Sequence, residues 1–304
     1  MSASLRAGVI GAGVFGGHHA AKWSDMAGVR LAAVLDTHLD RATALAARHG
    51  ARGFDDRDAF LAEVDIVSVC SPASHHAACA LASLKAGRAC YIEKPVATRL
   101  DEADALIAAA RAAGVVAACG FLERATFAAA GLTDRPERPV ALDFTRLGAP
   151  SPRNQDVSVV LDLMVHDLDL ALALTGSEPL TVEAEGRRNA KGLLDRCEAE
   201  VTFESGAVAR FRSSRLEREA LREAELHYAG GTVALDLVAR TLSDGAGLGL
   251  DPDFAKSAWG SDPLGASLAG FLAAVRGEGS PLAGLVEGAR ALDLALAVES
   301  AVGG

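Results

Sequence analysis

Short β-prone hydrophobic runs alternate with Ala- and Leu-rich stretches over the first 120 residues of the chain. This alternation is typical of a parallel sheet whose strands are joined by crossover helices. Strands are expected at residues 5–10, 31–35, 66–70, 89–92 and 115–119. Helices are expected at residues 41–49, 75–86 and 101–113. The pattern therefore predicts one complete doubly wound unit.

The pattern changes after residue 120, where polar and hydrophobic positions alternate along runs that are separated by short turns. Such alternation indicates an antiparallel sheet with one polar or partner-covered face. Strands are expected at residues 140–147, 181–187, 198–203, 207–213, 223–228 and 232–237. Helices are expected at residues 159–174, 264–276 and 286–302. The predicted fold class is α/β, with a doubly wound parallel sheet in residues 1–120 and a second α/β domain, with an open and mainly antiparallel sheet, in residues 121–304.

Composition narrows the possible functions. The 304 residues include 30 basic and 40 acidic side chains, and the formal charge of −10 argues against nucleic-acid binding. The five cysteines are odd in number and form no C-x-x-C pair, so we expect no disulfide framework, no zinc site and a reducing, cytoplasmic location. Only four residues precede the first expected strand, and no apolar run reaches 18 residues, so neither a signal peptide nor a membrane span is expected.

A glycine motif, Gly11-Ala12-Gly13-Val14-Phe15-Gly16, directly follows the first expected strand. Its glycines suit a tight turn, close approach of the backbone to a pyrophosphate, and packing of a helix on a strand. Asp36 lies 20 residues beyond Gly16, at the end of the second strand, where a carboxylate accepts hydrogen bonds from the adenosine ribose. Asp36 would repel a 2′-phosphate, which favours NAD over NADP. A plain turn and a solvated strand-end acid are the alternatives.

Two further groups of residues carry possible chemistry. Glu93-Lys94-Pro95 ends a strand at the carboxyl edge of the sheet, where a lysine donates to a substrate oxygen or forms an ordinary surface salt bridge. Asp162, His166 and Asp169 are spaced to share one face of the helix expected at 159–174. A histidine flanked by carboxylates suits a general base for alcohol deprotonation. A solvated charged face and a metal site are the alternatives.

Four other histidines are interpreted as helix-cap or surface residues. They are His18, His19, His75 and His76.

The motifs taken together resemble those of the glucose-fructose oxidoreductase and inositol dehydrogenase family (Gfo/Idh/MocA). The resemblance rests on the glycine motif, Ser71-Pro72 followed by His76, Glu93-Lys94-Pro95, and the run from Leu161 to Leu170 that contains Asp162 and His166. It implies an N-terminal Rossmann domain and a C-terminal domain whose open sheet supports substrate binding and association into a dimer or tetramer.

The same resemblance implies residue roles. Lys94 would bind the reacting hydroxyl, His166 would be the acid/base, and Asp162 would assist it. Glu93 would lie by the nicotinamide ribose, often with a cis bond before Pro95. The implied NAD-binding residues are Gly11, Gly13, Val14, Phe15, Gly16, Asp36, Ser71, Pro72, His76, Glu93 and Lys94.

The substrate expectation rests on two shorter stretches. Residues 120–124 and 156–162 are similar to the branch that acts on nucleotide sugars, notably UDP-N-acetylglucosamine 3-dehydrogenases, although Ala125-Thr126-Phe127 stands where that branch has Phe-Asn-Pro. A diphosphate needs local cations, because arginine binds phosphate with two hydrogen bonds. The arginines considered for this role, each of which could equally be a solvated surface residue, are Arg124, Arg146, Arg153 and Arg215.

The sequence thus predicts an NAD-dependent dehydrogenase that oxidises a secondary hydroxyl of a sugar. The expected substrate is a nucleotide sugar, bound with the help of Arg124 and Arg153, the latter because its loop leads into the helix that carries Asp162 and His166. One alternative is a dehydrogenase of a free polyol or aldose. A second alternative, of another class, is a non-catalytic NAD(H)-binding sensor.

Overall fold

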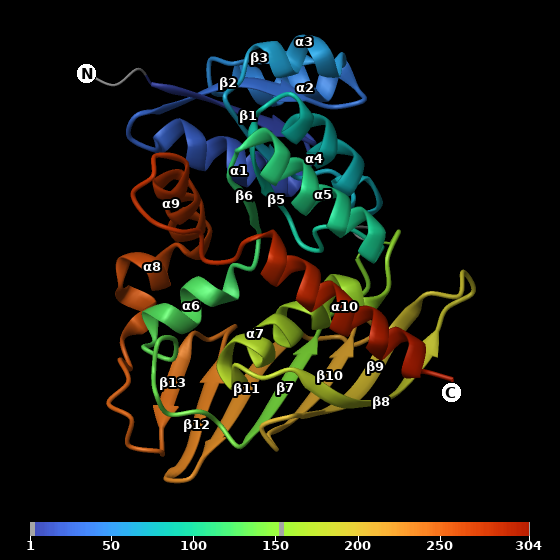
Figure 1. Ribbon diagram of the computed structural model, residues 1–304, viewed down its shortest axis with the longest axis vertical. Coiled ribbons are helices and arrows are strands. Elements are labelled where there is room, and N and C mark those ends of the chain that lie inside the picture. Colours follow the sequence, from blue (N-terminus) through green and yellow to red (C-terminus); the bar gives the residue numbers. More distant parts are fainter. Residues whose placement is uncertain (1–3, 152–154, 304) are drawn as a thin grey trace. The chain divides into compact units, whose positions relative to one another are not determined.

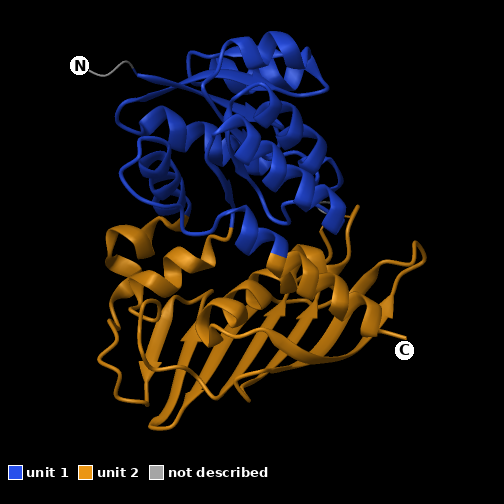
Figure 2. Cartoon of the chain, viewed as in Figure 1, with its two compact units in different colours: residues 1–120, 264–289 blue, residues 121–263, 290–304 orange. Residues whose placement is uncertain are grey.

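The computed structural model describes residues 4–151 and 155–303, which divide into two compact units (Figure 2). Unit 1 comprises residues 1–120 and 264–289, and unit 2 comprises residues 121–263 and 290–304. The expected second domain, residues 121–304, is therefore interrupted. Residues 264–289 join unit 1 because Leu268, Phe271 and Leu272 belong to its buried core.

Unit 1 contains a six-stranded parallel sheet with the strand order β3-β2-β1-β4-β5-β6 (Figure 1). The chain crosses over after β3, so β1 and β4 are neighbours at the point where the strand order reverses. Doubly wound sheets bind dinucleotides at this point. The strands are β1 (Leu5–Ile10), β2 (Val29–Leu35), β3 (Arg52–Phe54), β4 (Ile66–Val69), β5 (Ala89–Ile92) and β6 (Ala117–Cys119).

Helices cover this sheet and bury an aromatic core. Trp23 and Tyr91 each meet Phe271 edge to face, with ring centroids 6.3 and 5.8 Å apart, a geometry that aromatic pairs favour. Phe271 lies on α9, which explains why this late segment of the chain packs in unit 1. The helices are α1 (Val14–Asp25), α2 (Leu39–Ala47), α3 (Arg57–Ala62), η1 (Ala73–His75), α4 (His76–Lys85), α5 (Leu100–Ala113) and α9 (Pro263–Val275).

Unit 2 contains a seven-stranded sheet with the order β13-β12-β11-β7-β10-β9-β8. Its strands pair antiparallel except β7 and β10, which are parallel. The mainly antiparallel sheet that the alternation predicted is therefore confirmed. The strands are β7 (Ala141–Leu147), β8 (Pro179–Arg188), β9 (Leu194–Phe203), β10 (Val208–Ser214), β11 (Leu221–Tyr228), β12 (Gly231–Asp236) and β13 (Thr241–Asp244).

One face of this sheet is covered by helices (Figure 1). Phe144 and Phe211 stack on neighbouring strands with centroids 5.6 Å apart, and both are buried. The helices and helical turns that complete the described chain are α6 (Glu123–Ala129), η2 (Val160–Met164), α7 (Val165–Thr175), η3 (Phe254–Lys256), α8 (Ala258–Ser261) and α10 (Leu285–Ala301), the last of which spans the boundary at residues 289 and 290.

Candidate active site

The glycine motif of unit 1 forms the turn between β1 and α1, and each glycine has a separate structural reason. Gly11 has a φ of +100°, and a Cβ there would lie 2.6 Å from the carbonyl oxygen of Cys70. A Cβ on Gly16 would overlap the carbonyl oxygen of Gly11. A Cβ on Gly13 would meet no atom within 4 Å among the described residues. The position before α1 is thus open, as a backbone that approaches a pyrophosphate requires.

The end of α1 that faces this opening has no side-chain cap within the described chain, because its N-cap residue is Gly13. The first N–H groups of a helix without such a cap suit an anionic ligand. Val14 and Phe15 are 60% and 38% exposed, so the first turn presents apolar side chains beside these groups.

Asp36 directly follows β2 and lies beside the glycine turn. Its Oδ2 accepts a hydrogen bond of 2.8 Å from the backbone N–H of Ala12, and its Oδ1 accepts one of 2.9 Å from the N–H of His38. Partial burial acts to raise the pKa of Asp36, but these backbone bonds outweigh it and hold that pKa below its ordinary value. A carboxylate that stays ionised therefore lies next to the turn.

His76 connects two loops at the carboxyl edge of the sheet. Its Nδ1 lies 2.7 Å from the carbonyl oxygen of Pro95, and its Nε2 lies 2.8 Å from that of Ser71. Burial lowers the pKa of His76, and the two carbonyl groups oppose this effect only in part. His76 is the C-cap residue of η1, as a cap interpretation allows, but only 3% of it is exposed, so its interpretation as a surface residue is wrong. Pro72, which the same motif contains, is exposed.

Glu93-Lys94-Pro95 follows β5 at the same edge. The peptide bond between Lys94 and Pro95 is cis, as the resemblance implied. Glu93 is 6% exposed, and Lys94 is partly exposed. The Glu93 Oε1 atom lies 3.0 Å from Nε2 of His19, which is completely buried. The interpretation of His19 as a surface residue is therefore also wrong, whereas His18 and His75 are exposed.

The helix expected at 159–174 begins with a π-helical turn in unit 2. Asp162 lies in this turn, and His166 lies in the first turn of α7. The hydrogen bonds of a π turn span five residues instead of the four of an α-helix, so the turn is wider at Asp162 than the regular helix that the spacing argument assumed. Both side chains are partly exposed, and the His166 ring meets Phe121 edge to face at 6.2 Å. π turns of this kind occur frequently at functional sites.

Asp169 is buried in an ion pair. It is 1% exposed, and its carboxylate accepts two hydrogen bonds of 2.7 Å from Arg124. The neighbouring Asp167 is also buried and accepts bonds of 2.7 to 3.2 Å from Arg146. The alternative of a solvated charged face is therefore wrong for this helix. No cluster of His, Cys, Asp or Glu side chains in residues 4–151 and 155–303 is arranged to hold a metal ion.

The structure gives most of the predicted phosphate-binding arginines carboxylate partners. Arg124 pairs with Asp169, and Arg215 pairs with Asp195 at 2.7 Å. Arg146 pairs with Asp167 and also donates to Glu123 at 3.0 Å. Burial disfavours the charge of Arg146, but these carboxylates outweigh burial and raise its pKa. Arg153 lies outside the described residues.

Arg222 is an arginine of this site that the sequence interpretation did not single out. It lies on β11 directly opposite Arg146 of β7, and it is exposed. Within the described chain its guanidinium has no hydrogen bond or ion pair. Partial desolvation and the positive charge of Arg146 lower the pKa of Arg222. The nearby carboxylates act to raise this pKa but do not outweigh the other two effects. Alternation along β11 places Arg222 on the face of Ala224, but only the pairing of the strands reveals its neighbour Arg146.

None of the helices in the described parts of the chain is both long enough and apolar enough to pass through a membrane.

Comparison with known proteins gives matches along most of the chain. The family model described as "Oxidoreductase family, NAD-binding Rossmann fold" matches residues 5–121, and the model "GFO/IDH/MocA C-terminal domain" matches residues 140–234. UDP-N-acetylglucosamine 3-dehydrogenase of Acidithiobacillus ferrooxidans is 37% identical over 306 residues, which cover 98% of this chain and 97% of that protein. A solved structure of that enzyme superposes with a TM-score of 0.87 at 35% identity and covers 99% of this chain and 98% of that one.

Of two other similarities, one covers less of the chain and the other has a lower sequence identity. Inositol 2-dehydrogenase of Paracoccus denitrificans is 39% identical over 127 residues, which cover 40% of this chain and 38% of that protein. The WlbA dehydrogenase of Bordetella pertussis, solved with NADH and UDP-GlcNAcA, has a TM-score of 0.84 at 19% identity and covers 99% of this chain and 96% of that one. At that identity the superposition shows the shared fold alone.

Proposed function

Because the chain belongs to the Gfo/Idh/MocA family of NAD-binding oxidoreductases, we propose that it oxidises the 3-hydroxyl group of UDP-N-acetylglucosamine. The observation that carries the proposal is the 37% identity, along 98% of the chain, to an enzyme with that activity. The inositol dehydrogenase similarity covers only 40% of the chain, so it gives less support to a free polyol as substrate.

The residues around the glycine turn fit NAD. The open position at Gly13 and the uncapped start of α1 suit a pyrophosphate, and the ionised Asp36 suits the hydroxyls of an adenosine ribose. Glu93 and Lys94 follow β5, in the half of the sheet that takes the second nucleotide of a dinucleotide. When NAD is bound, it supplies the acceptor for the hydride that leaves the carbinol carbon.

Three side chains of this protein are proposed to handle the hydroxyl group. Lys94 donates a hydrogen bond to the hydroxyl oxygen and stabilises the negative charge that develops there. His166 accepts the hydroxyl proton as that oxygen becomes a ketone oxygen, and Asp162 supports the protonated form of His166. Loss of one proton to the base and one hydride from carbon balances the oxidation of an alcohol to a ketone.

The negatively charged part of the substrate requires local cations. Arg146 is buried between Asp167 and Glu123, whereas Arg222, opposite it on β11, presents an exposed guanidinium. We therefore add Arg222 to Arg124 and Arg153 as residues proposed to bind the substrate. A guanidinium gives two parallel hydrogen bonds to a phosphate or one to an acyl oxygen.

The test is NADH production from NAD with UDP-N-acetylglucosamine, myo-inositol and glucose under identical conditions. We expect turnover of the nucleotide sugar and a product two mass units lighter. The Arg222→Ala variant should lower kcat/KM for the nucleotide sugar by about tenfold or more, which corresponds to the ~1.5–3 kcal/mol of a hydrogen bond to a charged group. Turnover of only the free polyols would establish the alternative dehydrogenase. Binding of NADH without turnover of any sugar would favour the non-catalytic sensor.

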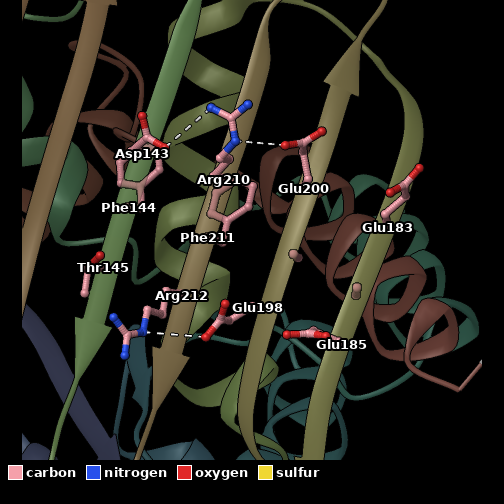
Figure 3. Close-up of a pocket in the computed structure, with 12 residues that line it drawn as sticks. Asp143, Phe144, Thr145, Glu183, Glu185, Glu198, Glu200, Arg210, Phe211 and Arg212 are labelled. Atoms are coloured by element: carbon pink, nitrogen blue, oxygen red, sulfur yellow. Dashed lines mark hydrogen bonds and ion pairs between the residues drawn. The ribbon is translucent and has the colours of Figure 1, made fainter.

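We also propose that two copies of the chain associate through the uncovered face of the unit 2 sheet. This face has an open hollow of about 480 Å³ lined by charged side chains (Figure 3). Arg210 of β10 lies between Glu200 of β9, at 2.8 Å, and Asp143 of β7, at 3.8 Å. Arg212 of β10 lies 3.6 Å from Glu198 of β9. The basic column of β10 in one copy can pair with the acidic side chains of β9 and β8 in the other.

Light scattering coupled to gel filtration tests this association. We expect a dimer or tetramer, and we expect the Arg210→Glu/Arg212→Glu variant to dissociate because it removes the basic column. A wild-type monomer would contradict the proposal. A cytoplasmic location is proposed as well, on the basis of the five free cysteines, and fractionation of the cells that produce the protein tests it.

A further inference from the structure

A chain of four buried polar side chains runs through unit 1 to Glu93. His19 of α1 is 0% exposed, with Nε2 at 3.0 Å from Oε1 of Glu93 and Nδ1 at 3.0 Å from Oγ of Ser68. The indole Nε1–H of Trp23, one turn further along α1, donates to the same Ser68 oxygen at 2.8 Å. Ser68 lies in β4, so the chain connects α1 and β4 with the end of β5.

The three hydrogen bonds that link Trp23, Ser68, His19 and Glu93 fit only one arrangement of protons when His19 is neutral and Glu93 is ionised. An indole N–H can only donate, so Ser68 accepts from Trp23 and directs its own proton to Nδ1 of His19. The His19 proton then lies on Nε2 and points at the Glu93 carboxylate. The opposite tautomer would direct a ring lone pair at a carboxylate oxygen, which is repulsive.

The Glu93 carboxylate packs closely against the backbone of Gly120. Glu93 is 6% exposed, and a Cβ on Gly120 would lie 2.8 Å from its Oε1 and 3.1 Å from its Oε2. No side chain at position 120 comes between the carboxylate and the backbone, and His19 supplies a ring N–H donor to one of the carboxylate oxygens. A buried carboxylate without a donor is costly and tends to rotate or to bind a proton.

We propose that His19 is a positioning residue for NAD binding, because it fixes the Glu93 carboxylate so that Oε2 can accept a hydroxyl of the nicotinamide ribose. The inference rests on the proposed cofactor site. Glu93 follows β5, in the half of the sheet that takes the nicotinamide nucleotide, whereas Asp36 and the glycine turn belong to the adenosine half. His19 thus acts on one half of the dinucleotide only.

Because His19 is proposed to act on the nicotinamide half alone, comparing ligands that fill one half or both distinguishes this role from a merely structural one. NADH spans both halves, whereas ADP reaches only the glycine turn and the end of β2. In the His19→Leu variant we expect the Kd of NADH to rise by about tenfold or more, the usual effect of losing a hydrogen bond to a charged group. The Kd of ADP should stay within about twofold of the wild-type value.

Two further variants separate the hydrogen bond from packing. His19→Gln carries an amide N–H at the distance of Nε2, so it should recover most of the NADH affinity. Tyr91→Phe is the matched control, because it deletes the buried hydrogen bond of 2.8 Å to Ser267 on a ring whose centroid lies 5.5 Å from that of His19. It should lower the melting temperature and leave the ratio of the NADH and ADP constants unchanged.

The Glu93→Gln background completes the experiment. If His19 acts through Glu93, His19→Leu should change NADH binding much less in that background than in the wild type. If His19→Leu does not fold, Ser68→Ala replaces it. This variant removes the donor to Nδ1 of His19 together with the acceptor of the Trp23 indole N–H, and it should weaken the binding of NADH and not of ADP. An unchanged NADH constant, an equal loss for ADP, or additive effects with Glu93→Gln would overturn the inference. A wild-type protein that binds no NADH would instead overturn the proposed cofactor site.

Discussion

The Asp36 carboxylate accepts a hydrogen bond of 2.8 Å from the backbone N–H of Ala12, and this bond ties the end of β2 to the glycine turn. One oxygen thereby holds the turn, and the other accepts the N–H of His38. The negative charge that remains lies beside the opening at Gly13. The acid thus shapes the turn and sets the electrostatic potential around it.

This charge predicts a preference for NAD over NADP. A 2′-phosphate would bring like charge to Asp36, so we expect the Kd of NADPH to exceed that of NADH by at least about tenfold, or ~1.4 kcal/mol. Asp36→Ser keeps an oxygen acceptor but removes the charge, and it should narrow that gap. Fluorescence titration with both dinucleotides measures the ratio. Equal affinities in the wild type would mean that Asp36 does not face the ribose.

The proposed proton chemistry predicts a separation of turnover from cofactor binding. His166→Ala should lower kcat by about 10²- to 10⁴-fold, the usual contribution of a positioned general base. Lys94→Ala should also remove most turnover, and Asp162→Asn should have a milder effect than His166→Ala. The Kd of NADH should change little in His166→Ala and Asp162→Asn, because both residues are proposed to act on the sugar hydroxyl. Steady-state kinetics beside NADH titration would refute the assignment if His166→Ala kept the wild-type rate.

The buried ion pairs of Arg146 predict a large loss of stability on truncation. Arg146→Ala leaves the buried Asp167 and the neighbouring Glu123 without their countercharge, and breaking such a pair costs about 3–5 kcal/mol. Arg99→Ala is the matched control, since Arg99 and Asp101 lie 2.6 Å apart but are 68% and 66% exposed. Its effect on stability should be much smaller, because solvent screens an ion pair at the surface. Urea unfolding gives both values, and similar losses in the two variants would contradict the prediction.

His76 predicts a dependence of stability on pH. Burial lowers the pKa of His76 from its ordinary value of 6.5, so the unfolded chain binds a proton more readily than the folded one. The stability associated with neutral His76 is therefore complete above pH 6.5 and decreases as the pH falls below it. His76→Asn should show a smaller decrease over this window, whereas His75→Asn, an exposed neighbour, should follow the wild type. Unfolding free energies measured between pH 5 and 8 would disprove this if all three proteins changed in parallel.

Local sequence determined much of unit 1. The glycine motif can be identified without the fold because its glycines are needed for local reasons. Gly11 has a positive φ, and Gly16 packs against the carbonyl group of Gly11, only five residues away. Strand periodicity placed Asp36 and Lys94 at the carboxyl ends of β2 and β5, since residues that follow parallel strands come to one edge of the sheet. These positions follow from strand periodicity and turn geometry, which depend on residues close together in the sequence.

Elements with little local pattern were not predicted. β3 and β13 contain three and four residues, too few for alternation to be distinguished from chance, and α3 has six. The π turn at Asp162 was likewise read as regular helix, because the hydrophobic pattern of η2 and α7 fits a helix of either kind.

Only the tertiary structure decided which polar groups are buried and with what they pair. His19 and His76 look like surface histidines in sequence, yet each is fixed by atoms from other parts of the chain, 74 residues away for Glu93 and 19 for Pro95. Arg146 and Arg222 become neighbours through the pairing of β7 with β11. Burial and charge pairing depend on contacts between distant segments, whereas hydrophobic periodicity reports only the face on which a residue lies. The sequence by itself determined the glycine motif and the longer strands of unit 1, and the tertiary structure decided which polar groups of the protein are buried and with what they pair.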